Sequence, residues 1–176
     1  SPPPGQSPAR LNITSDPAGA DIYLDYLSAG TSTPAVLDVG ETKPRNRHPD
    51  LAPTMVTVRK SGYPRPAQQS IEPVEAETKP LFFNLLAPAA GVVKVRTPPP
   101  GGGRVHVDAA EVFDGFAPIT YTNLTAGSHT LHIRKPGYLQ PRPVLVWVAA
   151  NQTNDVVVNL ATNTAPDLSL NARSVP

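Results

Sequence analysis

The histidines are the first residues to consider for chemistry, because imidazole is a common metal ligand and general base. The chain has four, His48, His106, His129 and His132. His129 and His132 are three residues apart, and residues at that spacing on a strand point to opposite faces of the sheet. One metal ion therefore cannot bind both on a regular strand, and the other two lie in distant segments. The sequence predicts no metal site.

Nucleophilic and acid–base catalysis also lack their usual residue patterns. The chain has no cysteine and no Gly-x-Ser-x-Gly sequence, the motif that presents a serine nucleophile at a sharp turn. Glu75 and Glu77 form a pair of neighbouring carboxylates, but prolines flank the segment and we interpret it as solvated surface. The glycines at 101–103 lack the lysine and hydroxyl residue of a phosphate-binding loop. We expect no catalytic residue, no cofactor and no enzymatic activity.

One basic segment could bind a ligand. Lys43, Arg45 and Arg47 lie in a proline-rich insertion from Glu41 to Pro53 and could contact an acidic surface polysaccharide. A solvated loop tip is the plainer interpretation, and we favour it. The net charge of +1 gives no reason to expect a nucleic-acid partner. No apolar run approaches the ~20 residues that a membrane-spanning helix needs.

Covalent or bound sugars are a further hypothesis. Asn12, Asn123 and Asn151 each begin an Asn-x-Thr sequence, the acceptor pattern for N-linked glycans. Asn123 and Asn151 fall in predicted turns, where a glycan would be accommodated. Three aromatic residues in predicted loops could stack on sugar rings, but they are scattered along the chain: Tyr26, Phe113 and Phe116.

These residues are set on a chain that repeats itself. The segment Val56–Tyr63 returns as Leu131–Tyr138, and both end in Arg-Lys-x-Gly-Tyr. An Asn-Leu pair follows each segment, at Asn84 and Asn159, and the spacing from the arginine is 25 residues in both halves. A repeat in this register indicates two copies of one small module.

The repeated signature has a structural explanation. Alternate apolar residues before it would face a core, as on a half-buried strand. Gly62 and Gly137 permit the positive φ of a turn that ends the strand. Tyr63 and Tyr138 would then fold back with the ring on the core and the hydroxyl near solvent. We favour this packing role over ligand binding.

The rest of the chain reads as short strands separated by turns. Alternation and β-branched residues predict strands at 11–14, 22–25, 35–39, 55–60, 71–74, 81–85, 92–96, 105–108, 119–121, 130–135, 144–148 and 156–160. We expect the first two strands of each half to pair as a hairpin, and the strand interrupted by Pro73 to lie at a sheet edge. Short strands at this spacing, in a chain with 23 prolines, are typical of an all-β sandwich.

The residues resemble PEGA domains, small β-sandwich modules of bacterial and archaeal surface proteins. The Pro-Glu-Gly-Ala turn of that family corresponds to Pro17-Ala18-Gly19-Ala20, and an apolar strand, a Gly…Thr-Pro corner and a strand ending in Lys-x-Gly-Tyr follow it. In the second copy, Pro98–Gly103 replaces the namesake turn. The resemblance implies a non-catalytic protein associated with a surface layer or with envelope anchoring.

We therefore predict an all-β fold of two tandem small β-sandwich modules (PEGA/Ig-like) with extended Pro-rich termini. The expected division is an N-terminal arm at 1–10, a sandwich at 11–86, a linker at 87–90, a sandwich at 91–161 and a tail at 162–176.

The tail is the main argument for assembly. Asp167–Ala172 alternates polar and apolar residues like a strand, although both predicted sandwiches are complete without it. Such a strand can add to an exposed sheet edge of a neighbouring molecule, with Leu168, Leu170 and Ala172 on one face. We expect an extracellular homopolymer, either a filament or a surface layer, assembled head to tail. Two alternatives are a tail folded back on its own module and an envelope-attached module that binds carbohydrate or peptidoglycan.

Overall fold

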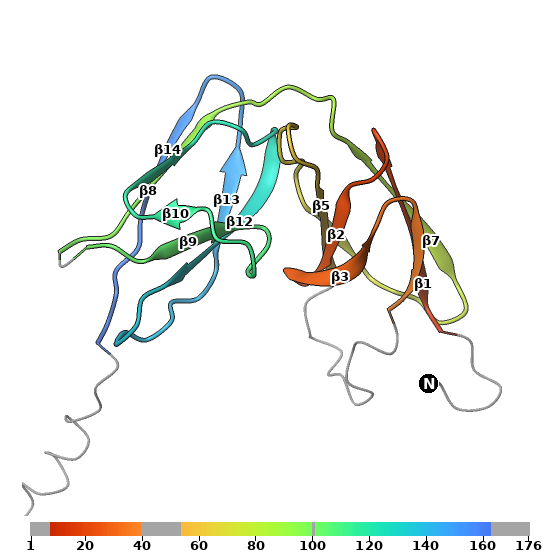
Figure 1. Cartoon of the computed structure of the whole chain (residues 1–176), viewed down its shortest axis with the longest axis horizontal. Coiled ribbons are helices and arrows are strands. Elements are labelled where there is room, and N and C mark those ends of the chain that lie inside the picture. The colour runs from red at the N-terminus through yellow and green to blue at the C-terminus, as the bar shows by residue number, and fades with distance from the viewer. Residues whose placement is uncertain (1–7, 40–53, 100, 163–176) are drawn as a thin grey trace, which may run out of the picture.

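The computed structural model describes residues 8–39, 54–99 and 101–162 (Figure 1). These residues form fourteen strands and no helix, so the predicted all-β sandwich class is confirmed. Among them, no helix is long and apolar enough to cross a membrane. The predicted tail from residue 163 on and most of the predicted N-terminal arm lie outside the described residues.

The first half of the chain forms one sandwich of two sheets. Its strands are β1 (Arg10–Asp16), β2 (Asp21–Leu24), β3 (Leu27–Ser32), β4 (Ala35–Asp38), β5 (Thr54–Arg59), β6 (Gln69–Ile71) and β7 (Thr78–Asn84). One sheet has the order β4-β1-β7 and the other β3-β2-β5-β6. Leu11 and Ile13 of β1 and Val56 and Val58 of β5 alternate into the core between them.

The second half repeats this arrangement. Its strands are β8 (Val92–Arg96), β9 (Arg104–Val107), β10 (Gly115–Phe116), β11 (Ile119–Tyr121), β12 (Gly127–Arg134), β13 (Val144–Val148) and β14 (Thr153–Val157). The sheets β11-β8-β14 and β10-β9-β12-β13 match those of the first sandwich strand for strand. Val93, Val105 and Leu131 belong to a second, separate core.

A parallel pair joins the first and last strands of each sandwich. β1 pairs with β7, with Ile13 opposite Leu81, and β8 pairs with β14, with Val95 opposite Val156. Every other strand pair is antiparallel among the described residues. The parallel pairs close each module on itself, because they connect segments far apart in the sequence.

The predicted hairpins between the first two strands of each half are wrong. β1 pairs with β4 and β7, whereas β2 pairs with β3 and β5. Both β1 and β2 bury one face, and the turn between them carries the chain from one sheet to the other, so that Leu11 and Ile22 meet in the same core. β8 and β9 are separated in the same way.

Several strand limits also differ from the prediction. The sequence interpretation missed β3, which has one large apolar residue, and β10, which has only two residues. β6 is an edge strand as expected, but it ends at Ile71, before Pro73. β14 begins at Thr153 rather than Val156, because its backbone pairs with β8 before its side chains become apolar.

Candidate functional site at the interface between the sandwiches

The two sandwiches meet through backbone hydrogen bonds as well as side chains. The segment after β5 lies beside the turn before β12, where the amide of Arg65 donates to the carbonyl of Asn123 at 2.8 Å and the amide of Thr125 donates to the carbonyl of Arg65 at 3.0 Å. The amide of Gln68 donates to the carbonyl of Ser128 at 3.0 Å. Paired in this way, residues 65–68 act as a short additional strand against the second sandwich.

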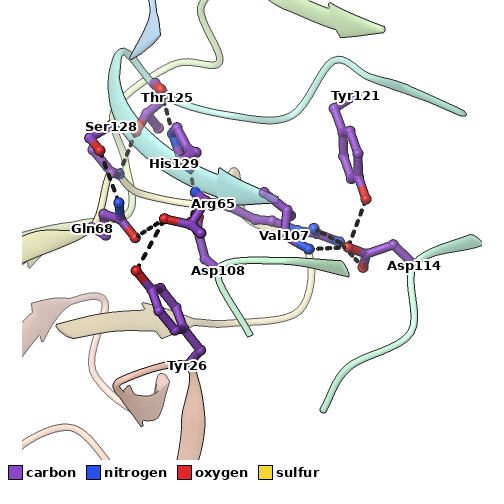
Figure 2. Close-up of polar contacts among 12 residues, drawn as sticks. Tyr26, Arg65, Gln68, Val107, Asp108, Asp114, Tyr121, Thr125, Ser128 and His129 are labelled. Carbon is purple, nitrogen blue, oxygen red and sulfur yellow. Dashed lines mark hydrogen bonds and ion pairs between the residues drawn. The ribbon is translucent and has the colours of Figure 1, made fainter. Parts of the chain in front are cut away.

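The charged centre of this interface is Asp114 (Figure 2). The Arg65 guanidinium donates two hydrogen bonds to its carboxylate, at 2.9 and 2.7 Å, and Arg59 lies 3.6 Å away. From the second sandwich, the Tyr121 hydroxyl and the Val107 amide donate to the same group at 3.0 and 2.9 Å. Asp114 therefore accepts hydrogen bonds from both sandwiches while its side chain is almost fully buried.

The surroundings of Asp114 favour its ionised form. Burial by itself raises the pKa of a carboxyl group. The hydrogen bonds and charge of Arg65, with Arg59 and Tyr121, outweigh that effect and lower the Asp114 pKa below its usual value. The same burial, together with the Asp114 charge, raises the Tyr121 pKa, so its hydroxyl remains a donor.

The Arg59 guanidinium makes fewer hydrogen bonds than that of Arg65. Its Nη1 atom is buried without a hydrogen-bond partner, and burial followed by repulsion from Arg65 lowers its pKa. A cavity of about 370 Å³ lies beside it, lined also by Asp21, Tyr23, Lys60 and Arg65. This cavity combines cations and a tyrosine ring, which suits an acidic or sugar ligand better than an apolar one.

A second, uncharged network continues the interface. Gln68 exchanges hydrogen bonds with Ser128 and Thr130 at 2.9 and 3.0 Å, and the Thr130 hydroxyl also lies 3.3 Å from the Tyr26 hydroxyl (Figure 2). The ring of Tyr26 packs edge-on against His132, with the centroids 4.6 Å apart. Tyr26 was predicted to lie in a loop as a possible sugar contact, but it is part of this interface.

Behind the network, Asp108 and His129 form a buried pair. His129 Nδ1 lies 2.6 Å from the Asp108 carboxylate and Nε2 lies 2.8 Å from the carbonyl of Thr125. Asp108 also accepts a hydrogen bond from the Thr130 amide at 2.7 Å. Both ring nitrogens therefore face oxygen acceptors, and neither is free to activate a hydroxyl. The pair orders the strand that faces the first sandwich.

The histidines of the described residues lie on β9 and β12. His129 points into the second sandwich and His132 out of it, so the predicted opposite orientation is confirmed. Across the described ranges, no three His, Cys, Asp or Glu residues gather as metal ligands. His48 lies outside those ranges.

Phe113 and Phe116 are brought together, contrary to their description as scattered. Their rings pack edge-on with centroids 5.0 Å apart, and the Arg104 guanidinium lies 4.5 Å from the Phe113 centroid. The short β9–β10 connection folds these residues back over one end of the sheet. They form an exposed cluster.

The candidate glycosylation sites lie in different settings. Asn12 is on the central strand β1, between β4 and β7. Asn123 is exposed, but Thr125 of its sequon is buried and its hydroxyl accepts a hydrogen bond from the Ala67 amide. Asn151 is exposed in the β13–β14 turn, with a φ of 61°.

The repeated glycines and tyrosines end β5 and β12. Gly62 and Gly137 have φ values of 87° and 85°, and a Cβ at either would meet nothing within 4 Å, so conformation rather than space favours glycine. Tyr63 packs against the first core, and the Lys135 ammonium lies 4.8 Å from the Tyr138 ring centroid. The remaining predicted site residues lie outside the described residues: Lys43, Arg45, Arg47, Leu168, Leu170 and Ala172.

Sequence reasoning missed the interface, although one signal was present. The outward positions of β12 carry Ser128, Thr130 and His132 rather than the lysine and glutamate typical of an exposed strand face. Small polar residues at such positions are compatible with a buried, hydrogen-bonded surface. The partners Arg65 and Asp114 gave no local signal, because 49 residues separate them.

Comparison with known families and structures agrees with part of the sequence interpretation. A PEGA domain is found at residues 90–163, which is the second sandwich. No curated protein sequence matches the chain significantly.

Three solved structures resemble the chain weakly. A minor pilin of Streptococcus agalactiae, GBS52, has a TM-score of 0.35 at 10% identity, over 90% of this chain and 98% of its own. The Bacillus anthracis TIE protein has a TM-score of 0.33 at 13% identity, over 89% of this chain and 34% of its own. A streptococcal ancillary pilin has a TM-score of 0.30 at 13% identity, over 93% of this chain and 64% of its own. All three TM-scores are below 0.5.

Proposed function

We propose that this protein is a non-catalytic structural subunit of an extracellular filament or surface layer. In this proposal, two PEGA-like sandwiches form one unit, and units join head to tail when the segment 163–176 of one adds to a sheet edge of the next. The subunit carries candidate glycans at Asn12, Asn123 and Asn151.

The best support for it is that the polar residues between the sandwiches form hydrogen bonds across the interface. Asp114, Arg65 and Gln68 each hold a partner in the other half of the chain. The buried histidine of the Asp108–His129 pair is likewise occupied at both nitrogens. Polar groups that hold two modules in one orientation suit a rigid spacer.

The PEGA domain at residues 90–163 favours the same role. The family resemblance implies surface-associated, non-catalytic proteins. The matching strand order of the first sandwich supports the view that it is a second, divergent copy of that module.

Removal of residues 163–176 tests the assembly. We expect the shortened chain to remain folded, since both sandwiches are complete by Thr162, and to stay monomeric where the full chain forms filaments in electron micrographs. Circular dichroism is the control for folding. Filaments of unchanged appearance would contradict assembly through the tail.

A carbohydrate- or peptidoglycan-binding module is the second candidate, and the cavity beside Arg59, Lys60 and Tyr23 favours it. A glycan array or cell-wall pull-down with monomeric protein separates the two. Specific binding that is lost in Lys60→Ala, or in Arg45→Ala with Arg47→Ala, would support the binding module.

A further inference from the structure

The outer edge of the second sandwich is unusually apolar. β13 is the edge strand of the sheet β10-β9-β12-β13, and its sequence Val-Leu-Val-Trp-Val contains no charge and no proline. Val146 and Val148 point into the core, whereas Leu145 and Trp147 are 68% and 70% exposed. An exposed apolar edge strand is a template for pairing with another chain unless something blocks it.

The matching edge of the first sandwich is blocked. β6 takes the place of β13 there, but it has only three residues, Gln69–Ile71, and Glu72 and Pro73 follow it. Short length, charge and proline are the usual protections of an edge. In the second sandwich a charge and two prolines stand before the edge strand, at Pro141, Arg142 and Pro143, and the five residues of β13 itself contain neither.

The backbone of β13 is oriented to receive a strand. The Asn154 side-chain amide, from β14 in the other sheet, donates to the Trp147 carbonyl at 3.2 Å. That carbonyl therefore points away from β12, and an added strand would replace the Asn154 amide as its donor. Because backbone groups two residues apart on a strand point the same way, Leu145 also directs its amide and carbonyl outward.

We propose that Asp167–Ala172 of a second copy adds to β13 as a fifth strand of this sheet. Leu168 and Leu170 are two residues apart, as are Leu145 and Trp147, so an added strand in register places both pairs side by side on one face. The inference rests on the proposed function and names the acceptor edge for the tail.

The last described residues favour a neighbour over the same molecule. Thr162 forms an antiparallel bridge with Tyr138, and the Leu139 amide donates to the Ala161 carbonyl. From Tyr138 the chain continues towards β13. Because Thr162 pairs antiparallel with Tyr138, the chain after Thr162 starts in the opposite direction, away from β13. Only four residues, 163–166, separate Thr162 from Asp167. They could extend about 13 Å, so the receiving edge of the neighbour must lie close to Thr162.

A complementation experiment with full-length protein tests this pairing. One variant, Trp147→Lys, has a damaged edge and an intact tail. The other, Leu168→Asp with Leu170→Asp, has a damaged tail and an intact edge. We expect each to be monomeric by light scattering alone, and an equimolar mixture to form dimers that grow no further, because each dimer joins the one good tail to the one good edge.

Phe82→Lys is the matched control. Phe82 is 57% exposed on β7, which is also an edge strand, so the substitution makes the same change on a different edge. It should assemble like the wild type. Trp147 is the single tryptophan of the chain, so its fluorescence should shift to shorter wavelength when wild-type protein or the mixture assembles.

The outcomes separate this inference from the proposed function. If the tail variant is monomeric but Trp147→Lys forms wild-type assemblies, the tail docks elsewhere, and only the β13 assignment fails. A mixture that stays monomeric, although both variants show wild-type circular dichroism, also overturns the assignment. If the tail variant assembles normally, or the wild type never assembles, the proposed function itself fails.

Discussion

At the scale of single residues, Asp114 is the carboxylate that joins the two sandwiches. It accepts hydrogen bonds from Arg65 in one sandwich and from Tyr121 and Val107 in the other. Removing one partner of a buried ion pair leaves an uncompensated charge, which costs more than the pair contributes by itself. The bidentate geometry also fixes direction, because both guanidinium donors must meet both carboxylate oxygens.

The substitution Asp114→Asn keeps the side-chain size but removes the negative charge from Arg65 and Arg59. We expect a loss of about 3–5 kcal/mol in the free energy of unfolding, measured by urea denaturation.

Asp38→Asn is the control, because Asp38 also pairs with an arginine, Arg10, at 2.9 Å, but with both side chains about half exposed. An exposed pair contributes less than about 1 kcal/mol. Equal losses for the two variants would show that Asp114 is no more than a surface ion pair.

At the scale of elements, the start of β12 lies very close to the segment after β5. A methyl group on Gly127 would lie 2.6 Å from Cβ of Ala67, closer than two non-bonded carbon atoms can approach. Gly127 also has a φ of 126°, which side chains rarely adopt. The close approach to Ala67 is a tertiary condition, since it arises where the two sandwiches meet.

Gly127→Ala should therefore destabilise the chain in two ways, through backbone strain and through displacement of Ala67. Gly137→Ala shares only the first, because Gly137 has a φ of 85° and open space around it. We expect thermal denaturation to show a further loss of about 1–3 kcal/mol for Gly127→Ala, the usual cost of overpacking. Equal melting temperatures would mean that the elements separate easily at this point.

At the scale of the whole molecule, the interface sets how the two sandwiches are oriented. Figure 1 shows them side by side, joined by the chain between β7 and β8. Their cores are separate, so each could persist if the contact between them were lost. The ionised Asp114 then adds a pH-dependent link to the backbone hydrogen bonds and the uncharged network that also join the two sandwiches.

The sign of this dependence follows from the lowered Asp114 pKa. The stabilisation is fully present above the unfolded-state pKa of about 4 and is lost as the pH falls through the lower folded-state value. We expect the stability difference between wild type and Asp114→Asn to shrink as the pH falls below about 4. A constant difference would contradict the ionised pair.

Small-angle scattering provides the matching structural measurement. The radius of gyration of a monomeric variant should increase at low pH while circular dichroism still reports folded sheets. If the radius of gyration increases only when the circular dichroism of the sheets is also lost, the sandwiches do not stay folded once their contact breaks.

The sequence by itself determined the repeat, the all-β class and most of the strands. These depend on short-range patterns, namely alternation, turn residues and the two Arg-Lys-x-Gly-Tyr segments, and such patterns follow from the geometry of a strand with one buried face. The expectation that His129 and His132 point apart came from the same periodicity, and the structure confirms it.

Only the tertiary structure decided how the strands pair and how the sandwiches meet. β1 and β2 have the same alternation whether they form a hairpin or face each other across a core, so the pattern cannot distinguish the two. Arg65 and Asp114 likewise resemble ordinary surface charges until the chain brings them to 2.7 Å. The energy of such contacts depends on burial and on partners distant in sequence, and local residue order contains neither.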